Sequence, residues 1–400
     1  MLRRSLWSLA RSFSAIAAVA WVSAIASAVD APAVDVRRIP NGGFQPDLAV
    51  GRAGAIHLVY YGGDSMAGDV FYLRSKDGGA TFSAPVRVNS QPGSAIARGT
   101  IRGPQIAVAP DGRVHVAWNG SDTAEPRGVA NPATGRRGSP MLYSRSSGQP
   151  LRFEPQRTLM THTFDLDGGG SIAAGEGGAV YVVWHANDVK EGAGEAARRV
   201  WLARSNDSGV TFAAESVAWS EPTGACGCCG MRLLAAGDTL RILYRSATAQ
   251  INRDIVSLVS SDRGRTFTGS RLHEWDIKAC PMTSMSIASQ GSRALGAWET
   301  DGQVYFADLT ASGAAAPRAP AGTGSDRRKH PRLAIDKDGR VLMAWTEGMS
   351  STSTTGGSLA WQVFGADGQP IGGPGRRPGV PPFSLGVVAA RPGGSFVLFY

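Results

Sequence analysis

The stretch Ser75–Phe82, SKDGGATF, decides the fold because the chain repeats it. The same pattern, S-x-D-x-G-x-T-F, returns as SNDSGVTF at Ser205–Phe212 and as SSDRGRTF at Ser260–Phe267. An Asp side chain can accept hydrogen bonds from the amides of its own turn, and a Gly supplies a positive φ. We expect the closing Phe to hold each turn against a hydrophobic core. Three copies with the same chemistry predict a repeated structural unit.

A second pattern runs in phase with these turns. Apolar segments that end in an aromatic residue, such as AIHLVYY, RVHVAWN and AVYVVWH, each follow a shorter apolar segment, such as PDLAV, PQIAV and GSIAA. Alternating apolar runs bounded by Gly, Asp and Pro are typical of strands, and helical periodicity is almost absent. Weaker copies of the turn fill the gaps at intervals of roughly 50–70 residues, a spacing that suits one four-stranded blade.

These repeats predict an all-β chain that forms a single β-propeller of four-stranded blades. Six full repeats are present, followed by a seventh inner hairpin at 383–400. The strand expected near 33–39 can pair with that hairpin, so the N- and C-terminal strands would close the ring. Six blades are favoured, and the strand count also allows seven.

The S-x-D-x-G-x-T-F turns resemble the Asp-box, or BNR repeat, of the sialidase superfamily, over most of residues 33–400. The chain also resembles a cysteine-containing bacterial subgroup of such proteins, which carry segments like GACGCCGM, CPM and RKHP. The resemblance implies a sialidase-like propeller, with six blades in the relatives. Whether the resemblance extends to an activity depends on the residues at the expected site.

The N-terminus predicts a secreted or periplasmic protein. Arg3, Arg4 and Arg11 precede an apolar run, AIAAVAWVSAIA, and a small-x-small pattern that ends at Ala28. We therefore expect a signal peptide at 1–28 and a sialidase-like propeller at 29–400. The run is too short for a lasting membrane span, and no later stretch is apolar enough for one.

The charge excludes some partners. The net charge of +9 falls to about +6 once the arginines of the leader are removed, which is modest for this length. No Lys/Arg block with interleaved aromatics occurs, so we expect no nucleic-acid partner. A glycan or another anionic small molecule is the expected partner, and a monomer is expected.

Propeller geometry places the candidate residues. Inner strands begin, and second strands end, at one face, whereas the S-x-D-x-G-x-T-F turns lie on the opposite face and have a structural role. The axial mouth, where the inner strands begin, is therefore the expected ligand site. The polar candidates there are Asp64, Asp69, Arg102, Asp167, His185, Arg245, Arg253, Glu299, Arg328 and His330.

The cysteines are also expected near this mouth. Cys226, Cys228 and Cys229 precede one inner strand, and Cys280 precedes the next. In an oxidising compartment such residues favour disulfides. The preferred pairing is Cys226 with Cys229 and Cys228 with Cys280, because adjacent cysteines rarely pair with each other.

Two alternatives use the same four cysteines without disulfides. Clustered thiolates near Met residues suit copper(I), and thiolates with His330 suit zinc, so copper or zinc is the alternative to having no cofactor. Thiol redox chemistry is the other alternative, although no thioredoxin-like C-x-x-C helix is present.

The sialidase resemblance implies a particular chemistry. Enzymes of that family hold the substrate carboxylate with three arginines, because a guanidinium binds a carboxylate through two parallel hydrogen bonds. Arg102, Arg245 and Arg328 come from different repeats on the expected face, and Arg253 is a rival. Each could instead pair with a nearby Asp. Asp167, His185 and His330 complete the expected substrate-binding set.

The catalytic residues of the family transfer less directly. They comprise a Tyr–Glu nucleophile pair and an Asp acid/base. Asp64 or Asp69 stands in the place of the acid, and Glu299 is the candidate partner carboxylate. No tyrosine stands where the nucleophile would be, since Tyr305 and Tyr400 are expected in strands. The family's first arginine lies in an R-I-P motif, which occurs here at 38–40, several residues early.

Three hypotheses follow from the sequence. The first is a secreted sialidase-like propeller that binds an anionic or glycan ligand and acts as an exo-glycosidase if it is an enzyme. The second is a copper, zinc or thiol-redox protein. The third is a non-catalytic binding module. The missing nucleophile favours the second and third, whereas an arginine cradle without a bound metal favours the first.

Overall fold

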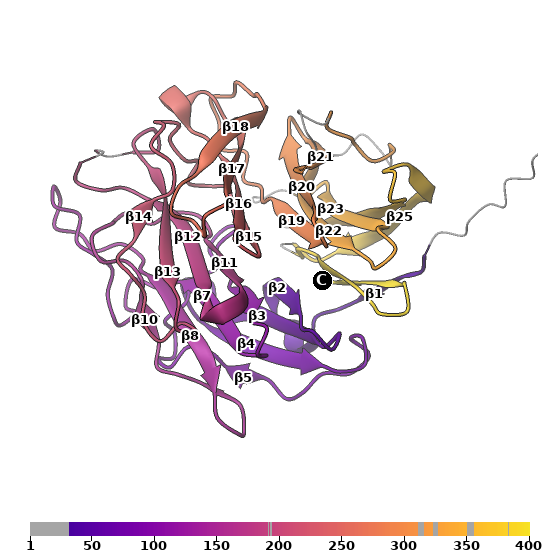
Figure 1. Ribbon diagram of the computed structural model, residues 1–400, viewed down its shortest axis with the longest axis horizontal. Coiled ribbons are helices and arrows are strands. Elements are labelled where there is room, and N and C mark those ends of the chain that lie inside the picture. Colours follow the sequence, from indigo (N-terminus) through magenta and orange to yellow (C-terminus); the bar gives the residue numbers. More distant parts are fainter. Residues whose placement is uncertain are drawn as a thin grey trace, which may run out of the picture. The chain divides into compact units, whose positions relative to one another are not determined.

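The computed structural model describes residues 32–190, 192, 194–310, 316–322, 327–349, 356–382 and 384–400. They belong to one compact unit, Ala31–Tyr400, and the expected signal peptide at 1–28 lies outside the described residues. The described part contains seven β-sheets that follow one another in chain order (Figure 1). Its helical segments are three short 3-10 turns, η1 (Pro40–Gly42), η2 (Glu176–Gly178) and η3 (Thr248–Gln250).

Each sheet is one blade of a propeller. Blade one contains β2 (Phe44–Val50), β3 (Ile56–Asp64), β4 (Ala67–Ser75) and β5 (Val86–Arg87). Blade two contains β6 (Gln105–Val108), β7 (Val114–Asn119), β8 (Met141–Ser147), β9 (Arg152–Phe153) and β10 (Arg157–Thr158). Blade three contains β11 (Ser171–Ala174), β12 (Val180–Ala186), β13 (Arg199–Ser205) and β14 (Ser216–Val217).

The remaining blades continue this order. Blade four contains β15 (Arg232–Ala236), β16 (Thr239–Arg245), β17 (Ile255–Ser260) and β18 (Thr268–His273). Blade five contains β19 (Ser286–Gln290), β20 (Arg293–Thr300) and β21 (Gln303–Asp308). Blade six contains β22 (Arg328–Ile335), β23 (Val341–Glu347), β24 (Gly357–Phe364) and β25 (Pro370–Val380). Blade seven contains β26 (Val387–Ala390), β27 (Phe396–Phe399) and β1 (Val34–Arg37).

The all-β propeller is confirmed, but the preferred count of six blades is wrong. The C-terminal hairpin, β26 and β27, does not join any of blades one to six. It forms a seventh with β1, which pairs in parallel with β27 from Val34–Phe396 to Arg37–Phe399. The chain ends therefore close the ring, as the sequence predicted. The described sheets have three to five strands, so four strands per blade holds only for blades one, three, four and six.

The inner strands of the seven blades contact one another in a closed circuit from β2 through β6, β11, β15, β19, β22 and β26 back to β2. They surround an axial cavity of about 150 Å³. Asp47, Arg232 and Arg332 line it, and Arg232 Nη2 lies 3.3 Å from Asp47 Oδ1. Burial, with the neighbouring Arg232 charge, lowers the pKa of Arg332 to about 9.

The S-x-D-x-G-x-T-F turns join the third and fourth strands of blades one, three and four and share one hydrogen-bond pattern. In the first, the Thr81 amide donates to Asp77 Oδ1 (2.9 Å) and the Gly79 amide to Ser75 Oγ (2.8 Å). Hydrogen bonds from Thr81 hold the pKa of Asp77 well below its usual range. Phe82 packs edge-on against Phe399 of blade seven, at 5.5 Å between ring centres. The turns therefore have the structural role predicted for them.

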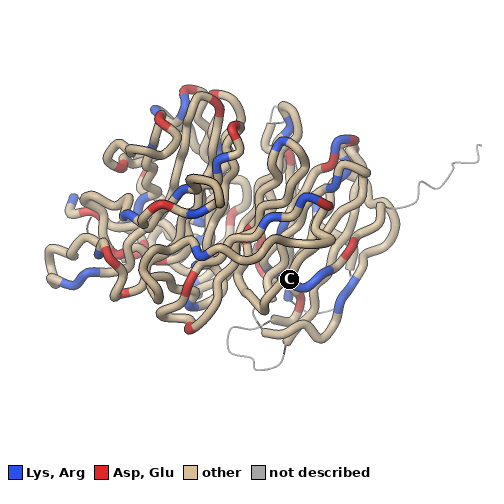
Figure 2. Tube along the Cα trace, turned by 90° about the horizontal axis from the view of Figure 1, so that it is seen from below, with Lys and Arg blue, Asp and Glu red and all other residues tan. Residues whose placement is uncertain are grey.

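The core lies between neighbouring blades. Second strands carry most of it, and each of four blades places one fully buried Trp near the end of that strand. These are Trp118, Trp184, Trp298 and Trp345. Charged residues of both signs are interspersed along the trace (Figure 2). Among the described residues, no helix is long and apolar enough to span a membrane.

Candidate functional site

Three thiols meet in the loop that leads into β15. Cys226 Sγ lies 3.4 Å from Cys228 Sγ and 3.3 Å from Cys229 Sγ, and all three Sγ atoms lie within 4.8 Å of one another. Cys226 and Cys229 are buried and Cys228 is half-buried. The loop stands at the axial mouth, where the inner strands begin, as the sequence predicted for these three residues.

Backbone contacts from three directions hold this loop. The Cys226 amide donates to the Arg245 carbonyl (3.0 Å), the Gly227 amide to Glu195 Oε1 (2.8 Å), and the Gly230 amide to the Thr283 carbonyl (3.0 Å). A Cβ on Gly227 would lie 2.2 Å from an Arg198 nitrogen. A larger residue at this position would therefore displace the end of the Arg198 side chain.

The disulfide prediction is wrong for this structure. All four cysteines are free thiols, and the Sγ separations in the cluster exceed the S–S bond length of about 2.05 Å. Cys280 is exposed and does not belong to the three-thiol group. Burial raises the pKa of the Cys229 thiol, but hydrogen bonds from Cys226 and Cys228 and the nearby Arg245 charge outweigh burial and lower it.

A chain of alternating charges runs beside the thiols. Arg102 donates to Asp167, and Arg198 lies 3.4 Å from the other oxygen of Asp167. Arg198 also lies 3.6 Å from Glu195, which Arg253 binds at 2.7 Å. The repeat pattern predicted Arg102, Asp167 and Arg253 near the mouth but did not indicate Arg198 and Glu195. They lie in a long insertion before β13 that matches no repeat, so only its charge could have indicated them.

His185 is the last residue but one of β12, the second strand of blade three, and lies near Arg198, Asp167 and Arg102. It is 2% exposed, and neither ring nitrogen has a hydrogen bond of normal geometry with a described residue. Burial and the Arg198 charge lower its pKa to about 4. His185 is therefore a neutral imidazole next to the charged network at neutral pH.

Arg245 and Glu299 form a second, fully buried pair. Arg245 Nη2 lies 3.6 Å from Glu299 Oε2, and its guanidinium lies 5.1 Å from the centre of the Trp275 ring. The Gly302 amide donates to Glu299 Oε1 (2.7 Å). Burial raises the pKa of Glu299 despite the Arg245 charge.

Blade six supplies Arg328 and His330, both from β22. Arg328 Nε lies 3.2 Å from Glu347 Oε1, and its guanidinium lies 5.2 Å from the Trp345 ring centre. His330 occupies an irregularity in β22 with φ of 53°, 3.3 Å from Ser284 Oγ. Burial lowers its pKa to about 3. Arg102, Arg245 and Arg328 thus each contact a carboxylate of the protein.

Asp64 and Asp69 flank the turn between β3 and β4. Asp64 is exposed and accepts from the Met66 amide, and Asp69 accepts from Asn89 Nδ2 (2.7 Å) and the Gly93 amide (2.9 Å). Among the described residues, no hydrogen bond or ion pair joins either Asp to Glu299. Their catalytic roles stay predictions.

A cavity of about 340 Å³ opens at the mouth between blades one and seven. Arg38, Phe44 and Tyr400 line it, and the Arg38 guanidinium lies 6.0 Å from the Tyr400 ring centre. Tyr400 directly follows β27 and continues its pairing with β1, because its amide donates to the Arg37 carbonyl (3.0 Å) and its carbonyl accepts from the Ile39 amide (2.8 Å). The expected strand position of this tyrosine therefore holds, at the end of the strand. Burial raises the pKa of Tyr400, but Arg38 and Arg377 outweigh burial and lower it.

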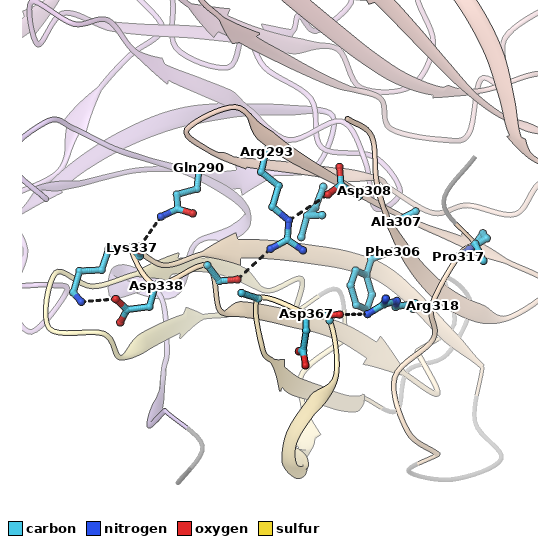
Figure 3. Close-up of a pocket in the computed structure, with 15 residues that line it drawn as sticks. Gln290, Arg293, Phe306, Ala307, Asp308, Pro317, Arg318, Lys337, Asp338 and Asp367 are labelled. Carbon is cyan, nitrogen blue, oxygen red and sulfur yellow. Dashed lines mark hydrogen bonds and ion pairs between the residues drawn. The ribbon is translucent and has the colours of Figure 1, made fainter. Parts of the chain in front are cut away.

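A larger cavity, about 790 Å³, lies between blades five and six at the opposite face (Figure 3). Its charges are already satisfied by the protein: Arg293 lies 3.3 Å from Asp308, Lys337 lies 2.6 Å from Asp338, and Arg318 donates to the Asp367 carbonyl. We therefore place the candidate site at the mouth.

The fold is that of the sialidase-like β-propellers. The chain resembles a Trypanosoma rangeli sialidase in complex with sialic acid (TM-score 0.52, 12% identity, 81% of this chain and 54% of that one). It also resembles a Hadza microbial sialidase (TM-score 0.51, 14% identity, 82% of this chain and 66% of that one). A leech intramolecular trans-sialidase complexed with 2,7-anhydro-Neu5Ac is also similar, with a TM-score of 0.51 and 12% identity over 80% of this chain and 67% of that one.

These likenesses concern the fold. The chain spans from about half to two thirds of the length of these three proteins. No protein-family model matches the chain, and no curated protein matches it in sequence.

Proposed function

We propose that the axial mouth binds an anionic ligand of the acidic-sugar class in the cavity that Arg38 and Tyr400 line. The cavity carries the proposal, because its volume of about 340 Å³ falls in the range of small-molecule sites. Arg38 is exposed and lies beside Tyr400, and a guanidinium in this position can form two parallel hydrogen bonds with a ligand carboxylate.

The lining supports a sugar rather than a simple ion. Phe44 and Pro46 offer apolar surface, whereas Ser384 and Tyr400 offer hydroxyl groups. A narrow axial space shares Pro46 and Leu385 with this cavity and leads toward Arg232 and Arg332. The positive charge on the axis favours an anion at the mouth.

Direct binding tests the proposal. Calorimetric titration with N-acetylneuraminic acid should give a saturable isotherm, and its methyl ester, which lacks the negative charge, should bind at least about tenfold more weakly. Arg38→Gln should weaken binding of the acid by a similar factor. Arg293→Gln, at the opposite face, is the matched control and should leave binding unchanged. Equal binding of acid and ester would contradict the proposal.

Hydrolysis of a glycoside is the finer form of the proposal. A tyrosine with a lowered pKa is a better nucleophile than an ordinary phenol, and Tyr400 has this property beside Arg38. A fluorogenic α-sialoside should be cleaved by the native chain and not by Tyr400→Phe. Glu299→Gln, Asp64→Asn and Asp69→Asn test the predicted carboxylates. Binding without cleavage would leave a non-catalytic binding module.

A further inference from the structure

We infer that Cys226, Cys228 and Cys229 form a binding site for a soft monovalent metal ion, and that Cu(I) fits their donor set. The inference does not depend on the proposed function, because it concerns a different part of the mouth. It rests on the positions of three sulfur atoms and on the contacts that hold their loop.

The sulfur positions suit a three-coordinate ion. All three Sγ atoms lie within 4.8 Å of one another, with two separations of 3.3 and 3.4 Å. An ion bonded to three sulfurs in one plane at about 2.3 Å separates them by about 4 Å. Two edges of the triangle therefore need to open by only several tenths of an ångström.

The loop is held in place without the ion. Contacts with the Arg245 carbonyl, the Glu195 carboxylate and the Thr283 carbonyl fix it to the end of β16, to the insertion before β13 and to the segment before β19. The two ends of the triad are buried and Cys228 is half-buried. An ion can thus approach from the Cys228 side while the rest of the site excludes water.

The donor set favours Cu(I) over zinc. Soft thiolates select Cu(I) and zinc, but zinc almost always takes four ligands. Among the described residues, no His, Asp or Glu atom joins the three-thiol group. Three thiolates around Cu(I) carry a charge of about −2. The Arg245 guanidinium, which also contacts Glu299, is a cation that favours negative charge on Cys229. Binding releases the remaining thiol protons to solvent.

Metal transfer tests the inference. The reduced full-length protein is mixed under anaerobic conditions with the Cu(I)–bicinchoninate complex, and loss of the complex's colour reports copper taken by the protein. We expect one copper per chain. Cys229→Ser and Cys228→Ser should each weaken the competition by about 100-fold or more. Cys280→Ser, a thiol outside the cluster, is the matched control and should bind as the native chain does.

The variants separate loss of the site from loss of the fold. Cys228 is the least buried member, so Cys228→Ser should keep the native thermal transition, and a binding loss in this variant belongs to the site. Failure of both copper and zinc to transfer to the native chain would overturn the inference. Equal losses in Cys280→Ser and Cys229→Ser would also overturn it. A site that takes zinc ions but leaves Cu(I) with bicinchoninate would overturn the choice of ion.

Discussion

Gly79 is a residue whose identity depends on a neighbouring blade as well as on its own turn. Its φ is 88°, which favours glycine, and a Cβ would lie 2.4 Å from Phe399 Cζ of blade seven. Gly79→Ala should therefore lower the free energy of unfolding by about 1–3 kcal/mol, through backbone strain and overpacking. Chemical denaturation followed by tryptophan fluorescence measures this loss.

Gly393 provides the matched control for that substitution. Its φ is outside the left-handed region, and a Cβ there would meet nothing within 4 Å. Gly393→Ala should leave stability unchanged within about 0.5 kcal/mol. Equal losses in the two variants would show that the contact with blade seven is not the cause.

His57 makes stability depend on pH. It is buried, its Nδ1 lies 2.7 Å from Tyr72 Oη, and burial lowers its pKa from 6.5 to about 4. Above pH 6.5 the His57 imidazole is neutral in both the folded and the unfolded chain. Below it the unfolded state binds the proton first, so stability falls as the pH drops from 6.5 toward 4. The expected loss at pH 4 is about 3 kcal/mol.

A pH series of denaturation curves checks this expectation. His57→Gln should make the loss between pH 6.5 and 4 shallower, because the proton acceptor is gone. An unchanged slope in His57→Gln would contradict the assignment.

At the scale of elements, the second strand of each blade has the most uniform role. Its apolar residues contact both neighbouring blades, and in four blades a buried Trp of this strand completes the packing near the mouth. Trp184→Ala in β12 should cost about 3–5 kcal/mol of unfolding free energy, because a fully buried ring leaves a cavity. Trp361→Ala in β24 removes a half-buried ring and should cost clearly less. Calorimetric unfolding compares the two.

The sequence pattern predicts the position of the loops at the mouth but not their conformation. Their sequence position predicted that Cys226, Cys228 and Cys229 lie at the mouth, because each loop precedes an inner strand. It did not predict that Cys280 stays apart, since loop conformation depends on side-chain contacts that no repeat defines. The same reason explains the missed pair Arg198 and Glu195, which join the charged network from an insertion outside the repeat.

At the scale of the whole molecule, ring closure depends on β1. This strand pairs with β27, and Arg37 Nη1 donates to the Gly79 carbonyl of blade one (3.1 Å). Deleting residues 1–37 should lower the free energy of unfolding by at least about 3 kcal/mol, because the pairing and its apolar contacts are lost. Deleting residues 1–31 keeps β1 and should have no such effect. Equal stability of the two proteins, measured by denaturant titration, would contradict a closing role.

The sequence by itself determined the class of fold, the order of the strands, the face that carries each loop, and the closing of the ring by the two chain ends. These follow from local patterns, because alternation and turn chemistry repeat with the blade. Only the tertiary structure decided the number of blades, the free thiols and the cavity beside Tyr400. The blade count depended on which partner β1 takes. The thiols and the cavity depended on contacts between residues far apart in the chain, which a local pattern does not encode.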